Sequence, residues 1–127
     1  MRRIARRLVP LLFVVCGCGL LNPGGGIGRT EAERIAVGQV AGTVDRVVSA
    51  RVLPLGEAVG PNVHPGPPRD QIVWAIVLEG TFPPGSCGPV QADGQAPVCP
   101  PPQRTALVVI DYATGEFIVT AMPADLP

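Results

Sequence analysis

Apolar residues along the chain gather in segments that glycine- and proline-rich stretches separate. The most apolar of these segments is QIVWAIVLEGTF, residues 71–82, in which both alternating sets of positions are hydrophobic. A strand with two apolar faces is typical of the middle of a sheet. Trp74 lies within this segment, which favours a core position over an exposed binding residue.

Residues 104–123, RTALVVIDYATGEFIVTAMP, have the pattern of a β-hairpin. Two apolar arms, TALVVID and EFIVTAM, flank the four residues Tyr112–Gly115. Gly115 can supply the positive φ that a short turn requires. The side chains of Asp111 and Thr114 can accept or donate hydrogen bonds within the turn. These three residues therefore have a predicted structural role.

A short helix is predicted to begin at Thr30. Thr30 and Glu33 have the spacing of a capping box, in which Thr30 is the N-cap. One helical face then collects small and apolar residues, and Gly42 can close the helix. The residues of that face are Ala32, Ile35, Ala36 and Val40.

Residues 43–53, TVDRVVSARVL, follow with an alternating pattern that favours a strand. One face would carry Val44, Val48, Ala50 and Val52, with Asp45, Ser49 and Arg51 on the other. A continuation of the helix through this stretch remains an alternative.

Two long proline-rich stretches, residues 54–70 and 83–103, are predicted to be loops. Cys87 and Cys99 lie in the second one and are predicted to form a disulfide. Closing a loop of about 13 residues would contribute around 3 kcal/mol in the chain-entropy description. A metal site at these cysteines is disfavoured because only His64 is available as a third ligand, and zinc prefers four.

The elements together predict an α+β domain over residues 30–123. One short N-terminal helix would pack on a three- or four-stranded antiparallel sheet with long proline-rich loops, followed by a tail at residues 124–127.

The first 17 residues have the layout of a signal peptide. MRRIARR is a basic segment, and LVPLLFVV is an apolar segment followed by small residues. The apolar run from Leu8 to Leu21 is shorter than the ~20 residues a membrane-spanning helix needs. This segment could act as an ordinary signal peptide that is cleaved nearby, or as a twin-arginine signal. The two cysteines near its end favour a third interpretation.

Val15-Cys16-Gly17-Cys18 resembles the lipobox of bacterial lipoproteins, although Cys16 stands where alanine or serine is usual. The resemblance implies that Cys18 is lipidated and becomes the first mature residue. Residues 18–29 would then hold the lipidated cysteine and a glycine-rich spacer, and the domain would be anchored to the bacterial membrane on its extracytoplasmic side. GGGIGRT, residues 24–30, is better explained as spacer than as a phosphate-binding loop, because it lacks the lysine and the glycine spacing.

Composition and charge narrow the range of functions that we expect for this chain. Without residues 1–17 the chain has 6 arginines and 10 carboxylates, a net charge of 6 − 10 = −4. An acidic chain of this kind argues against nucleic acid as a partner. No catalytic, metal-binding or cofactor-binding motif is present around His64, Ser49 or Ser86, so an enzyme is not expected and no cofactor is implied.

The order of a TEAERIA helix, a VWAIVLEGTF strand and an ALVVIDYATGEFI hairpin resembles the small exported PepSY-like, cystatin-like domains of bacterial lipoproteins. Its most specific part is the turn that contains Val109, Asp111, Thr114, Gly115 and Glu116. The resemblance implies a binding or inhibitory module for peptidases at the cell envelope. We therefore expect a non-catalytic, membrane-anchored binding module for an envelope protein or peptide. A structural or accessory subunit of an envelope complex is the alternative.

Overall fold

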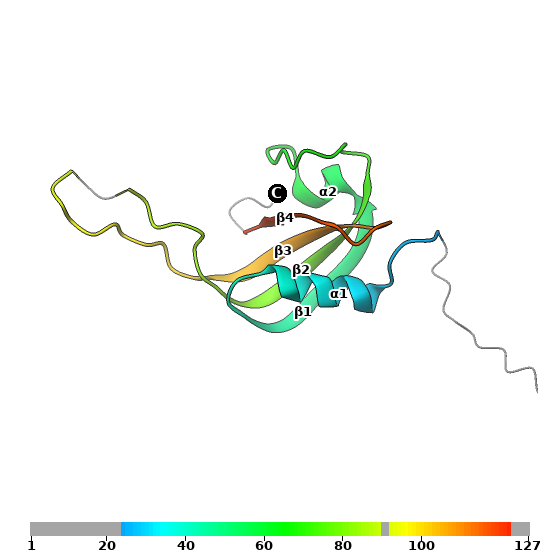
Figure 1. The fold of residues 1–127 in the computed structure, drawn as a ribbon, viewed down its shortest axis with the longest axis horizontal. Helices are drawn as coiled ribbons and strands as arrows, with labels where there is room; N and C mark the ends of the chain where they lie inside the picture. Colours follow the sequence, from blue (N-terminus) through cyan, green and yellow to red (C-terminus); the bar gives the residue numbers. More distant parts are fainter. Residues whose placement is uncertain (1–23, 90–91, 123–127) are drawn as a thin grey trace, which may run out of the picture.

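Four antiparallel strands follow one another across an open sheet in the computed structural model, which describes residues 24–89 and 92–122 (Figure 1). The strands, in spatial order, are β1 (Thr43–Pro54), β2 (Ile72–Phe82), β3 (Gln103–Asp111) and β4 (Phe117–Ala121). A helix, α1 (Arg29–Gln39), packs on one face of this sheet. The predicted α+β fold is confirmed, with four strands.

The two central strands have buried residues on both faces, as the sequence predicts for residues 71–82. Trp74, Ile76 and Leu78 of β2 pack in the cluster that contains the α1 residues Ala32 and Ala36. The alternate residues of β2 face the other side, where a second cluster holds Leu55, Val59, Val73, Ala75, Leu107, Val109 and Ala121. The sheet therefore has an apolar core on each side.

The start of α1 differs from the predicted capping box. The helix begins at Arg29, Gly28 is its N-cap, and no side chain caps it. Thr30 lies inside the helix, and Glu33 instead accepts a hydrogen bond of 2.6 Å from Nε of Arg29. An ion pair between residues four apart on a helix satisfies the Glu33 carboxylate without the reciprocal cap.

The predicted apolar face of α1 is confirmed, since Ala32 and Ala36 are fully buried and Ile35 and Val40 pack beside them. The helix ends before Gly42, at a C-cap formed by Val40. Gly42 has a φ of 110° in the connection to β1, and a Cβ there would overlap the carbonyl oxygen of Thr81. Glycine is therefore required at residue 42 for the turn into β1 rather than as a helix cap.

Residues 43–54 form a strand, which settles the open choice between strand and helix. The predicted face is wrong in part, because the pairing with β2 shifts register at Asp45 and at Val48. Each extra residue reverses the alternation. Val44, Val47 and Ala50 therefore pack toward the α1 core, whereas the Val48 side chain is 49% exposed.

The stretch 54–70 is not a loop throughout. Leu55–Val59 form a short helix, α2, whose Leu55 and Val59 are buried against the face of the sheet opposite α1. Arg69 fixes the return of the chain by donating to the carbonyl oxygens of Gly56 at 3.0 Å and Gly60 at 2.6 Å.

In the described part of the chain, no helix is long and apolar enough to cross a membrane.

Candidate functional site

The segment between β2 and β3 projects from the sheet as an extended arm, here defined as residues 83–102 (Figure 1). None of its described residues is buried, and Val98 is 80% exposed. Cys87 and Cys99 are joined by the predicted disulfide. In its described residues, the arm is therefore an exposed, covalently closed and proline-rich element that joins the sheet at its two ends.

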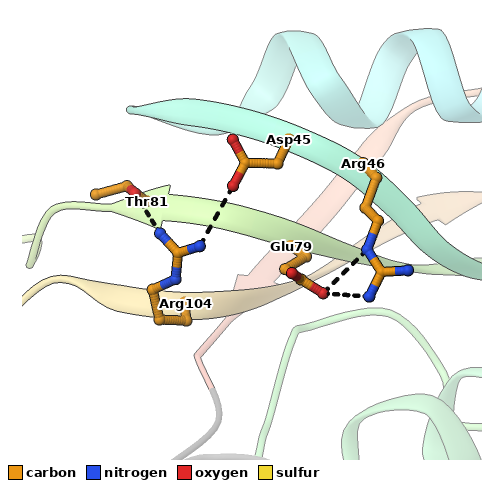
Figure 2. A network of polar contacts seen from close by, with 5 residues as sticks. All are labelled: Asp45, Arg46, Glu79, Thr81 and Arg104. Atoms are coloured by element: carbon orange, nitrogen blue, oxygen red, sulfur yellow. Dashed lines mark hydrogen bonds and ion pairs between the residues drawn. The ribbon is translucent and has the colours of Figure 1, made fainter.

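A polar network fixes the sheet where the arm leaves it (Figure 2). Arg104 of β3 donates to the Thr81 hydroxyl at 2.7 Å and reaches Asp45 of β1 at 3.3 Å. Arg46 donates through two nitrogens to one oxygen of Glu79, at 2.6 and 3.1 Å. These exposed pairs contribute little stability individually, but together they link β1, β2 and β3 at the base of the arm.

The chain enters the domain at the opposite end of β2. The Ile27 amide donates to the Tyr112 carbonyl at 2.9 Å, and Nε1 of Trp74 donates to the Ile27 carbonyl at 3.1 Å. Gly26 lies so close to the Tyr112 ring that a Cβ there would overlap it. Residues 26–28, which the sequence assigns to the spacer, thus contact the domain, and Trp74 is a core residue as predicted.

The β3–β4 turn has the hydrogen bonds that the sequence predicts. Asp111 accepts from the Thr114 amide at 2.7 Å and from the Thr114 hydroxyl at 2.9 Å, and Gln71 donates to its other oxygen. Gly115 has a φ of 78°. Partial desolvation opposes ionisation of Asp111, but these donors outweigh it and hold the pKa of the carboxyl below its ordinary value.

A groove of about 520 Å³ lies between this hairpin and the loop after α2. Its charged residues are Asp111 and Glu116, and none of its lining residues is basic. The full lining is Pro65, Pro67, Gln71, Asp111, Thr114, Glu116, Phe117 and Ile118. His64, although it precedes Pro65 in the sequence, is exposed and does not line the groove.

The face of the sheet opposite α1 has a smaller hollow of about 200 Å³ beside α2. Arg51 and Glu57 lie at this hollow, and the Arg46–Glu79 pair lies on the neighbouring strands. The rest of the lining of this hollow is apolar and consists of Leu53, Ala58, Ala75, Val77 and Leu107.

The three residues around which the sequence shows no catalytic motif lie in different parts of the chain. Ser49 lies in β1, Ser86 in the arm and His64 in the loop after α2. In residues 24–89 and 92–122, no group of three or more His, Cys, Asp or Glu side chains is placed to hold a metal ion. Cys18, the signal peptide and the tail 124–127 lie outside the described residues.

No protein-family model, curated protein or solved structure matches the chain. The similarity to PepSY-like domains therefore stays a prediction from the sequence. Sequence reasoning missed the groove and the attachment of Ile27 to Tyr112 and Trp74. The groove depends on where the loop after α2 folds back, and a proline-rich sequence does not specify that position.

Proposed function

We propose that this protein is an exported lipoprotein, tethered to the bacterial membrane through an acylated Cys18, that acts as a non-catalytic binding module on the extracytoplasmic side. Its arm would present the recognition surface to an envelope protein. A peptidase is the partner that the PepSY-like resemblance suggests.

The observation that carries the proposal is the placement of the chain entry and the arm at opposite ends of β2. Ile27 is bound near the first residues of β2, and the arm begins after Phe82 at its last residue. A strand of 11 residues extends for about 35 Å at ~3.3 Å per residue. The chain that leads from a tether at Cys18 would thus join the domain at one end of the sheet, whereas the arm leaves the sheet at the other end.

The chemistry of the arm also supports recognition. Prolines restrict the backbone and lower the conformational entropy lost on binding. The described residues of the arm carry a single charge, on Asp93, and Val98 is highly exposed. Exposed loops on a rigid sheet commonly carry binding residues, and a disulfide is typical of an exported protein.

In-cell photo-crosslinking would test this role. A photoreactive amino acid at Val98 should give one discrete adduct with an envelope protein. The same residue at Val37, which is 42% exposed on α1, should give none and serves as the matched control. Equal crosslinking from both positions, or none from Val98, would contradict the proposed role of the arm.

A further inference from the structure

The two edge strands of the sheet differ in how well they are protected from pairing. β1 carries two register shifts, three charged side chains and a terminal proline, Pro54. Bulges, charges and prolines are the features by which proteins prevent an edge from taking another strand. β4 has the sequence FIVTA, which contains no charge and no proline and is rich in β-branched residues.

In the described structure, the outer edge of β4 has backbone groups that could pair with another strand. The sheet contains four strands and β4 pairs only with β3, so one row of its backbone groups has no strand partner among the described residues. The strand is partly uncovered, since Phe117 is 39% exposed and Ile118 to Thr120 are half-buried, whereas Ala121 at its end is buried. An extended peptide could therefore pair with this edge through main-chain hydrogen bonds.

The groove lies at the start of the same strand and adds side-chain specificity. Phe117 and Ile118 of β4 form part of its wall, with Pro65 and Pro67 contributed by the loop after α2. Both Asp111 oxygens accept hydrogen bonds from within the protein. Glu116 is exposed at the mouth of the groove. It is therefore the carboxylate available to a ligand.

We infer that the outer edge of β4 binds an extended peptide as a fifth strand, with a lysine or arginine of that peptide in the groove beside Glu116 and Phe117. A cation there would meet one free carboxylate and, over the Phe117 ring, the electron-rich face of an aromatic side chain. Antiparallel pairing, as in the rest of the sheet, places this basic residue at the C-terminal end of the bound segment. The inference depends on the proposed binding role but not on the arm.

A fluorescent peptide, Thr-Val-Thr-Val-Thr-Lys with blocked ends, can test the inference by fluorescence anisotropy with the detergent-extracted full chain. Glu116→Gln should weaken binding about two- to fivefold, because one partly exposed charge pair is lost. Glu57→Gln, a change in the separate hollow beside α2, should leave the affinity unchanged. A peptide with glutamate in place of lysine should bind the parent protein no more tightly than the lysine peptide binds the Glu116→Gln variant.

Two N-methylated versions of the peptide test the main-chain pairing itself. Methyl groups on alternate amides remove hydrogen-bond donors from one edge of the peptide only. One of the two versions should therefore lose affinity by about tenfold or more, and the other should bind normally. Equal affinities for the two versions would overturn pairing at an edge.

The same assay separates this inference from the role of the arm. A variant with residues 86–100 replaced by a short glycine-serine linker should bind the peptide like the parent protein. No measurable peptide binding by the folded parent protein overturns the edge site but leaves the arm crosslinking result standing. A concentration-dependent dimer that the peptide dissociates would assign the edge to a second copy of the chain instead, which also overturns the inference.

Discussion

Asp111 illustrates how much a single residue in the β3–β4 turn does. Its carboxylate accepts hydrogen bonds from Thr114 and Gln71, and so connects the turn with the residue before β2. The sequence identified Asp111, Thr114 and Gly115 because Asx-type turns depend on neighbouring residues. The contact with Gln71 spans 40 residues and depends on the strand register, so local sequence rules could not reveal it.

Asp111→Asn should destabilise the protein by about 1 kcal/mol at neutral pH, because hydrogen bonds to a carboxylate are replaced by weaker ones. The pKa of Asp111 is lowered on folding, so its contribution is complete above the unfolded pKa of about 3.9 and is lost as pH falls through the folded pKa. Urea unfolding at pH 7 and pH 3 should show the difference between parent and variant shrinking at the lower pH. Asp70→Asn serves as the exposed control, and a difference that grows on acidification would contradict this account.

Gly26 marks the point at which the chain joins the domain. Gly26→Ala should lower the free energy of unfolding by about 1–3 kcal/mol, because the added methyl group overlaps the Tyr112 ring. Gly38→Ala, where a Cβ meets no atom within 4 Å, should raise it by up to about 1 kcal/mol through helix propensity. Thermal unfolding of both variants provides the comparison. A neutral Gly26→Ala would mean that residues 26–28 belong to the flexible spacer.

At the scale of elements, the sequence predicted which segments form strands better than it predicted which side chains of a strand face the core. β2 was assigned correctly because a strand that is apolar on both faces has no alternation to misread. The face of β1 was misassigned because two extra residues reverse the pattern within a single strand. Bulges of this kind depend on the partner strand, and the sequence of β1 alone does not contain that information.

The register of β1 gives a matched pair of substitutions. Val47→Asp should cost about 2–3 kcal/mol because it places a charge against the α1 core. Val48→Asp should change stability by less than about 0.5 kcal/mol because that side chain is half exposed at the bulge. Denaturant unfolding of the two variants measures both effects. The reverse order would restore the simple alternation that the sequence suggested.

The disulfide is expected to shape the arm more than it stabilises the fold. The loop-length estimate of around 3 kcal/mol assumes that the cross-linked segment is ordered in the native protein. The described arm residues are not buried and strands hold the arm at both ends. Cys87→Ser with Cys99→Ser should therefore lower the unfolding free energy by only about 1 kcal/mol or less.

Limited proteolysis provides the complementary readout for the same double variant. Cleavage within residues 83–102 should become faster without the disulfide, while the rest of the domain stays protected. A loss near 3 kcal/mol, or cleavage throughout the domain, would instead mean that the arm is part of the cooperatively folded core.

At the scale of the whole molecule, the proposed function depends on geometry that follows from the strand topology. A meander of four strands places the β2–β3 connection and the β3–β4 turn at opposite ends of the sheet. The chain from the predicted anchor joins the domain at the β3–β4 end, and the arm leaves at the other. The sequence predicted the tether and the arm separately. Only the structure shows that the two lie at opposite ends of the sheet, because this placement arises from the contact of Ile27 with Tyr112 and Trp74.

The most direct test of this account is the intact mass of the protein extracted from native membranes, measured before and after reduction. The account predicts a chain that begins at Cys18, carries acyl groups and gains about 2 Da when the Cys87–Cys99 disulfide is reduced. That result would establish both the lipid anchor at Cys18 and the disulfide that closes the arm. A lipid-free mass would contradict the membrane-tethered binding module.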